Sequence, residues 1–157
     1  MEGDPLLRKK CRVVEKFDGR LAALFDDLKE TLSAVEGLGL AAPQVGVLKR
    51  AALIVYDDKI FEVVNPEILE TRGECVDDEG GLSVGDRRGL VRRPQYIKLK
   101  YFDRDGNERL LEAEDYFARV FFHEIDHLDG ILFTDKIEEP ESKPSQSNKK
   151  DKRSKNG

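Results

Sequence analysis

His123 and His127 lie four residues apart, with the acid Glu124 between them, in the segment His-Glu-Ile-Asp-His. On an α-helix this spacing places both imidazoles on one face, one turn apart, where they can bind a single metal ion. Glu124 can accept and deliver a proton beside that metal. The chain contains no other histidine. The alternative is a buried helix whose histidines fall in register by chance, and the motif favours the metal site.

The residues around the motif predict the helix that it needs. Residues 118–128 are apolar on nearly every side, as in a helix at the centre of a fold. Asp115 is a suitable N-cap, and Gly130 is a suitable end. A second helix is predicted from Asp18 to Glu36, capped by its first residue and ended by Gly37. Its apolar stripe contains Leu21, Leu24, Phe25, Leu28, Leu32 and Val35.

The middle of the chain has the pattern of β-strands. We expect strands at residues 51–56, 60–64, 67–74, 95–102 and 108–113. A turn is expected at Asp57–Lys59, a break at Asn65–Pro66 and a hairpin turn at Asp103–Asn107. One domain with both helices and strands is therefore predicted for the 157 residues.

Composition excludes several classes of function. The formal net charge of −5 gives no overall basic field for binding nucleic acid. The longest apolar stretch, residues 51–56, is too short to cross a membrane, and residues 1–5 lack the apolar region of a signal peptide. Cys11 and Cys75 are too few for a disulfide framework and favour a reducing cytoplasm.

The C-terminal residues have no apolar side chain to bury. Residues 138–157 are rich in Pro, Ser, Lys and Asn, so we predict a disordered polar tail after a folded domain at residues 1–137. Its basic tip, Lys149–Lys155, is a candidate contact for RNA, although tails of this kind are usually inert.

Residues 37–46 contain a Gly-x-Gly-x-x-Ala pattern that suggests a dinucleotide site. That fingerprint follows a strand and opens a helix, whereas this segment follows a predicted helix and leads into Pro43, so we reject it. What remains is a glycine-bearing apolar segment whose backbone a ligand can approach closely, ending in the amide of Gln44. A purely structural loop is the alternative.

A catalytic site of the zinc type normally has three protein ligands, so two histidines need a partner. The metalloprotease pattern H-E-x-x-H-x-x-G-x-x-H fails here because Phe133 occupies its last position. Proteases with a distal carboxylate ligand would require Glu138, Glu139 or Glu141, which lie at the head of the predicted tail. Neither class fits well.

Three separated segments together resemble the peptide deformylase family. That family carries G-x-G-L-A-A-P-Q, E-G-C-L-S and H-E-x-D-H in this order, and the chain has related segments at residues 37–44, 79–83 and 123–127. The likeness covers residues 3–137, including Asn65–Pro66. It implies an α+β fold in which antiparallel and mixed β-sheets wrap around a central helix carrying the H-E-x-D-H motif.

The resemblance also implies a reaction, the hydrolytic removal of the formyl group from the initiator methionine of nascent bacterial-type polypeptides. His123 and His127 would bind a divalent metal, Fe²⁺ first, with Zn²⁺, Ni²⁺ or Co²⁺ as alternatives. Glu124 would carry the proton, while the Gln44 amide and the Leu82 backbone N–H would donate to the formyl oxygen. The implied substrate contacts are Leu38, Gly39, Leu40, Glu79, Gly80 and Val120. The partners would be formyl-methionyl nascent peptides and, through the basic tail, the ribosome, with no DNA and no membrane.

The chain departs from the family at Gly81, where the family has the cysteine that is its third ligand. Loss of a thiolate should weaken metal binding. Three interpretations stay open. Water or a nearby carboxylate replaces the thiolate in an active enzyme; the chain is a module that binds formyl-methionine N-termini without turnover; or Gly81 is an introduced change in an ordinary enzyme. The nearby carboxylates are Asp77, Asp78, Glu79 and Asp86, and Cys75 is a weaker candidate ligand.

Overall fold

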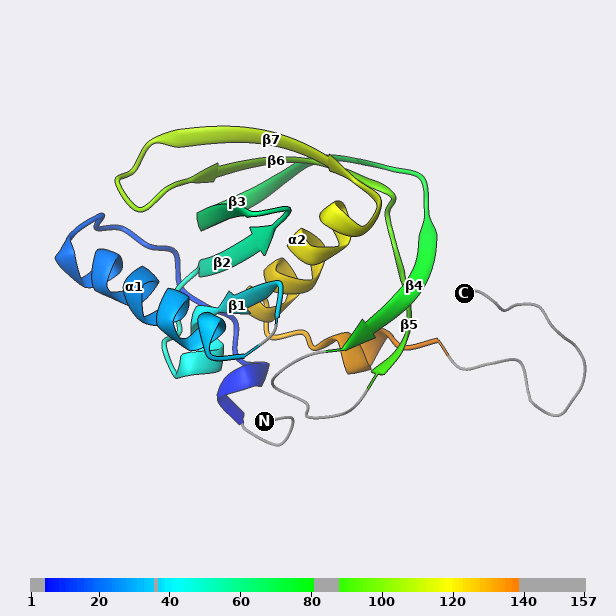
Figure 1. The fold of residues 1–157 in the computed structure, drawn as a ribbon, viewed down its shortest axis with the longest axis horizontal. Helices are drawn as coiled ribbons and strands as arrows, with labels where there is room; N and C mark the ends of the chain where they lie inside the picture. Colours follow the sequence, from blue (N-terminus) through cyan, green and yellow to red (C-terminus); the bar gives the residue numbers. More distant parts are fainter. Residues whose placement is uncertain (1–4, 36, 81–87, 139–157) are drawn as a thin grey trace, which may run out of the picture.

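The computed structural model describes residues 5–35, 37–80 and 88–138 (Figure 1). Two α-helices and two antiparallel sheets make up most of this part of the chain. The helices are α1 (Gly19–Ser33) and α2 (Asp115–Leu128), and the short 3-10 helices are η1 (Pro5–Arg8), η2 (Ala42–Val45) and η4 (Phe133–Lys136). The strands are β1 (Gly39–Ala41), β2 (Ala51–Tyr56), β3 (Lys59–Arg72), β4 (Cys75–Gly80), β5 (Arg88–Arg93), β6 (Tyr96–Phe102) and β7 (Glu108–Glu114).

Five strands form one sheet in the order β1-β2-β3-β6-β7, and β4 and β5 form a second sheet. All of these pairs are antiparallel, in agreement with the predicted α+β class. In Figure 1 the two sheets curve around α2, which lies on the inside of the curve, while α1 lies outside it. The helix with the histidines is therefore the centre of the fold, as predicted.

Alternating side chains of the five-stranded sheet face the two helices. Leu53 packs into the core on the α1 side, and its neighbour Ile54 packs into the core on the α2 side. The α1 side contains Leu21, Leu24, Phe25, Leu28 and Leu32 of the helix with Leu40, Ala51, Leu53 and Val64 of the sheet. The α2 side contains Ala118, Val120, Phe121, Phe122 and Ile125 of the helix with Ile54, Val63, Ile97, Leu99 and Ala113 of the sheet.

Helix α1 begins as predicted and ends early. The Asp18 side chain accepts hydrogen bonds from two backbone N–H groups of the first turn, which confirms the N-cap. The helix stops at Ser33 with Ala34 as its C-cap, so the predicted end at Glu36–Gly37 is wrong. Val35 is consequently 43% exposed rather than part of the apolar stripe. The chain has to turn here because β1 begins at Gly39.

Helix α2 ends near the predicted residue, but its predicted N-cap is wrong. β7 leads directly into the helix, Glu114 is the N-cap, and Asp115 has a φ of 58°. Because Asp115 is already inside the helix, its carboxylate accepts a hydrogen bond from the Gln95 side chain instead of capping. Gly130 has a φ of 77°, which favours glycine, and a side chain there would collide with the Arg8 carbonyl.

The expected break at Asn65–Pro66 is a bulge inside one long strand. β3 continues to Arg72, and its pairing with β6 shifts register between Val64 and Glu67. Asn65 has a φ of 50°, and its side chain bonds both the N–H and the C=O of Val14. The bulge thus ties the N-terminal segment to the sheet. Strands β1, β4 and β5 were not predicted.

The packed part of the chain reaches one residue into the predicted tail. The Glu138 N–H donates to the Leu90 carbonyl at 2.7 Å, and its carboxylate pairs with Arg92. The rest of the predicted tail lies outside the described residues. Among the described helices, none has the length and hydropathy that crossing a membrane requires.

Candidate active site

Both histidines lie on one face of α2, as their spacing predicted. Their ring centroids are 5.3 Å apart, and the planes are inclined at 62°. His127 is buried, and His123 is nearly so. The Phe133 ring of η4 stacks on His123 with the centroids 5.6 Å apart. The two imidazoles are therefore held close together in an interior that restricts their rotation.

His123 is oriented by a carboxylate from the other sheet. Its Nδ1 lies 2.9 Å from Oε1 of Glu79 on β4, which leaves Nε2 as the ring nitrogen for a further partner. A carboxylate on the second ring nitrogen is the usual arrangement behind a metal-ligating histidine, because it fixes the tautomer and raises the basicity of the ligating nitrogen.

Glu79 is itself held by two buried arginines. Arg93 donates through Nε and Nη2, each at 2.9 Å, and Arg119 donates from α2. Arg93 also pairs with Asp126, so β4, β5 and α2 are joined through one ion-pair network. Burial acts to raise the pKa of Glu79, but the hydrogen bonds from Arg93 and His123 lower it to about 2. Glu79 is therefore an anion at every ordinary pH.

Sequence reasoning missed this network. It placed Glu79 among the substrate contacts, whereas the side chain faces His123 and the arginines. The available signal was Arg119, a single charge within the apolar stretch 118–122 of the predicted central helix. A buried arginine needs a carboxylate partner, although the sequence alone does not say which one.

The pKa values of the two imidazoles shift in opposite directions. Burial acts to lower the pKa of His123, but the hydrogen bond to Glu79 and the charges of Glu124 and Glu79 raise it overall. Among the described residues His127 has no carboxylate hydrogen-bonded to its Nδ1, and burial, with the charges of His123 and Arg93, lowers its pKa to about 3. His127 is therefore neutral at pH 7, which is the form that binds metals.

Glu124 is buried against the backbone of β1. Oε2 of Glu124 would be 2.6 Å from a Cβ built at Gly39, so only glycine leaves room for the carboxylate. Its Oε1 is buried and has no hydrogen-bond partner among the described residues. Burial raises the pKa of Glu124 to about 7. A carboxylate with a pKa near 7 suits proton transfer at neutral pH.

The glycine-bearing segment lies on the same side of α2. β1 pairs only with β2 in the described sheet, so its other edge is open there. Gln44 follows in η2 and is half-buried, and its Oε1 accepts a hydrogen bond from the Ala41 N–H at 2.9 Å. This bond orients the amide and makes Nε2 the donor end of the side chain. Gly39 of this segment lies against Glu124 of the histidine helix.

The residues fit a divalent metal only in part. Two neighbouring imidazoles, a neutral His127 and a buried Glu124 oxygen without a described partner match a catalytic metal centre. The described residues nevertheless contain no group of three metal-ligating side chains. Gly81, Leu82 and Asp86 lie outside the described residues, so the position of the missing ligand and the predicted Leu82 donor are not placed.

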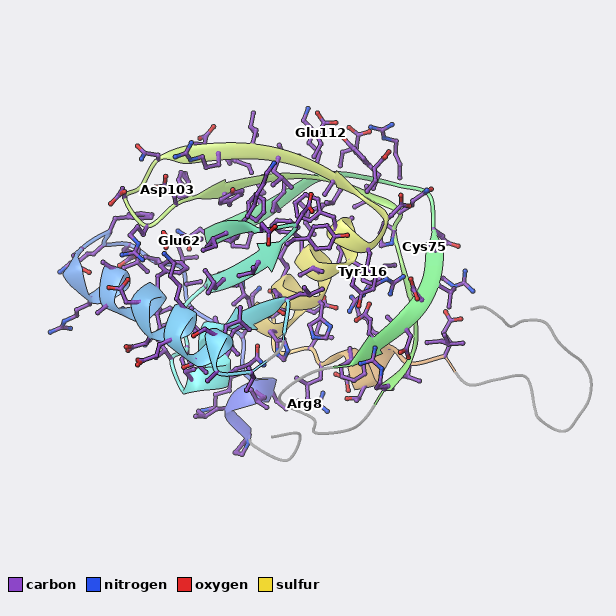
Figure 2. All side chains as sticks on the ribbon, in the orientation of Figure 1. Arg8, Glu62, Cys75, Asp103, Glu112 and Tyr116 are labelled. Carbon is purple, nitrogen blue, oxygen red and sulfur yellow. The ribbon has the colours of Figure 1, made fainter. Side chains whose placement is uncertain are left out.

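The replacement ligands suggested by the sequence are engaged elsewhere. Glu79 bonds His123 and two arginines, and Asp78 pairs with Arg88 at 2.6 Å. Cys75 Sγ lies 3.5 Å from Nη2 of Arg119, and Figure 2 shows Cys75 on β4 near the level of Tyr116, in the first turn of α2. Within the described part of the chain, the structure therefore offers no third ligand from these side chains.

The remaining predicted substrate contacts lie on β4, on α2, and on or beside β1. Leu38 is 40% exposed beside β1, whereas Leu40 is buried in the α1 core. Val120 lies one turn before His123 and Glu124 and packs in the α2 core, and Gly80 is the last residue of β4. No ligand tests these contacts, so they stay predictions.

Replacement of Glu79 by glutamine should destabilise the protein strongly. The change leaves Arg119 without its carboxylate, and breaking a buried ion pair costs about 3–5 kcal/mol. Urea unfolding followed by circular dichroism measures the effect. The matched control is Asp78→Asn, which breaks an exposed ion pair at the preceding residue of β4 and should cost less than about 1 kcal/mol. Equal losses in both variants would show that the Glu79 network is not a buried anchor.

Similar proteins were found by sequence. A model of the family described as Polypeptide deformylase matches residues 1–143. The chain is 54% identical over 139 residues to Peptide deformylase 1 of Clostridium acetobutylicum, covering 88% of this chain and 93% of that protein. It is also 54% identical over 154 residues to the peptide deformylase of Caldicellulosiruptor bescii, covering 94% and 93%.

Solved structures have the same fold. The crystal structure of peptide deformylase from Thermotoga maritima superposes with a TM-score of 0.85 at 41% identity, covering 87% of this chain and 94% of that one. The peptide deformylase of Synechococcus elongatus, in complex with actinonin, gives a TM-score of 0.85 at 35% identity, covering 87% and 76%.

Proposed function

Because this chain belongs to the polypeptide deformylase family, whose members are metal-dependent hydrolases, we propose that α2 is its catalytic helix and that His123 and His127 hold the metal. The proposed reaction is hydrolysis of the formamide of N-formylmethionyl peptides to formate and a free amine. The proposed metal is Fe²⁺, with Zn²⁺, Ni²⁺ and Co²⁺ as alternatives. The observation that carries the proposal is Glu124, a buried carboxylate that follows His123 on α2 and lies against Gly39.

Glu124 moves the proton in this proposal. His123 and His127 would hold a divalent metal, which would lower the pKa of a bound water to near neutrality. Glu124 takes a proton from the attacking water, whose oxygen adds to the formyl carbon. When the carbon–nitrogen bond breaks, Glu124 delivers the proton to the departing amine nitrogen. Burial supports this role because it holds the pKa of the carboxyl near 7.

Gln44 stabilises the negative charge that develops on the formyl oxygen. Its Oε1 is fixed by the Ala41 N–H, which supports Nε2 as the donor. Loss of one such donor typically lowers the rate by about 10²–10³. We assign the second donor, the Leu82 N–H, from the sequence resemblance alone.

The open edge of β1 supports binding of an extended peptide. A peptide can add to a free strand edge through backbone hydrogen bonds, with side-chain pockets providing selectivity. We place the substrate backbone along Leu38, Gly39 and Leu40, and opposite Glu79–Gly80 at the end of β4. Val120, on α2, is assigned to the side of the methionine pocket.

Formate release from N-formyl-Met-Ala-Ser tests the proposed activity. Protein loaded with excess Fe²⁺ or Ni²⁺ under anaerobic conditions should release formate, and chelation should abolish it. N-acetyl-Met-Ala-Ser is the matched control and should not be cleaved. Gly81 favours a second candidate, a binding module without turnover. That candidate is correct if loaded protein binds the formyl peptide in calorimetry and releases no formate.

We also propose a cytoplasmic location and contact with the ribosome through the basic tail. Both described cysteines, Cys11 and Cys75, are free thiols, which supports a reducing compartment. Support for the ribosome contact comes from the sequence of residues 149–155 and from the nascent chains that the family acts on.

A further inference from the structure

Unpaired cations are concentrated in one segment of the described chain. Most described lysines and arginines have a carboxylate within ion-pair distance, for example Arg8 with Asp135 and Arg50 with Asp129. Those without a described carboxylate partner are Lys9, Lys10, Arg12, Lys16 and Arg20 in the N-terminal segment, and Lys49, Lys59 and Lys98 elsewhere.

Four of these side chains line one hollow of about 500 Å³. The hollow is formed by the N-terminal segment, the start of α1 and Lys49. The four side chains are Arg12, Lys16, Arg20 and Lys49, and we call them the cationic hollow. The N-terminal segment passes the end of α2, where the Cys11 N–H donates to the Leu128 carbonyl at 2.8 Å, and then runs along the outside of the fold to the start of α1 (Figure 1). None of the residues that line the cationic hollow belongs to the proposed active site.

The backbone holds two of the cations side by side. Arg12 and Lys49 form a parallel β-bridge, with the Arg12 N–H bonded to the Leu48 carbonyl and the Arg50 N–H bonded to the Arg12 carbonyl. Neither the Arg12 nor the Lys49 side chain has a described carboxylate partner. Two adjacent like charges repel each other, and this cost persists unless an anion from outside lies between them.

The acids in the hollow do not neutralise it. Asp18 and Glu15 are its only acidic lining residues among those described. The Asp18 carboxylate is occupied with the N–H groups of Arg20 and Leu21 at the start of α1. Four cations therefore face one uncommitted carboxylate, in a protein whose net charge is −5.

We propose that the cationic hollow binds the phosphodiester backbone of RNA. Three of the four cations come from residues 12–20 and the fourth, Lys49, lies beside Arg12, so their neutralisation takes several phosphates rather than one compact anion. A bilayer surface fits less well because Val13 is the one well-exposed apolar lining residue, at 63% exposure. The choice of RNA over DNA rests on the proposed function, because an enzyme that acts on nascent chains works beside RNA.

Fluorescence anisotropy with a labelled 20-nucleotide single-stranded RNA tests this proposal independently of formate release. Single-strand binding loses affinity with salt at about 0.7 logarithmic units per neutralised phosphate, so four cations give a slope near −3. R12Q/K49Q in the full chain should lower the slope by about 1.4 and weaken binding roughly 10-fold at ~0.1 M salt. The two hydrogen bonds of the β-bridge between Arg12 and Lys49 join backbone atoms, so the side-chain substitutions leave them in place.

Two control variants separate this surface from general charge effects. K59Q/K98Q removes two unpaired cations elsewhere and should leave the slope unchanged. A second control replaces the five basic residues of Lys149–Lys155 with glutamine and should leave the loss caused by R12Q/K49Q intact. Single-stranded DNA of equal length should bind comparably, since the contacts are to phosphates. The proposal is overturned by an absence of RNA binding, by equal losses in K59Q/K98Q, by binding that depends on the tail alone, or by binding only to phosphatidylserine vesicles.

Discussion

Glu124→Gln should lower kcat for formate release by about 10²–10⁴, the range typical of general acid–base catalysis. Glutamine has nearly the shape of glutamate and fits the same space against Gly39, but it cannot take up a proton from water. His123 and His127 are unchanged, so metal content by mass spectrometry should stay within twofold. The loss should therefore appear in kcat with little change in metal occupancy.

The matched control for this variant is Glu108→Gln, on the exposed first residue of β7. It removes the same charge far from the histidine motif in sequence and should leave kcat unchanged. Full turnover of metal-loaded Glu124→Gln would remove Glu124 from the proton-transfer role. Loss of metal in that variant would instead assign Glu124 to binding.

Gly81→Cys should tighten metal binding by more than about 10–100-fold. Removal of a residue that only orients a metal ligand typically weakens binding by that factor, and a restored ligand should have a larger effect. A thiolate adds a negative charge and a third protein ligand to the two imidazoles. Turnover should rise with occupancy. Competition with a chromophoric chelator under anaerobic conditions measures the affinity, and formate release measures the activity.

Gly81→Ser is the matched control, because serine has a similar size and no thiolate. It should gain little affinity. If Gly81→Cys gains neither metal nor turnover, Gly81 does not occupy the ligand position, and the resemblance has been misaligned there. If Gly81→Ser gains as much as the cysteine variant, the effect comes from backbone stiffening rather than from ligation.

Helical features of this site were predictable because they depend on local periodicity. The four-residue spacing of His123 and His127 and the apolar residues around them sufficed to place both rings on one face of a central helix. Asp18 was recognisable as an N-cap for the same reason, since a cap acts on its own first turn. The wrong cap at Asp115 shows the limit, because β7 enters α2 without a loop.

Features that depend on pairing across the chain were not predictable. β4 reads as an acidic segment, and its Glu79 is buried only because Arg93 and Arg119 approach from β5 and α2. β1 is three residues long and exists because β2 pairs with it. The bulge at Asn65 looked like a strand break because its stabilising contact, Val14, is distant in sequence. Most of the features that the sequence did not predict therefore depend on contacts between residues that are distant in the chain.

The central claim is that one metal binds between the imidazoles of α2, next to Glu124. Anomalous diffraction from crystals soaked in saturating Co²⁺ or Ni²⁺, measured at the absorption edge, tests it most directly. We expect a single strong peak at about 2.0–2.1 Å from one nitrogen each of His123 and His127, with Glu124 facing it. A strong peak elsewhere, or no peak at these residues under saturating metal, would contradict the account.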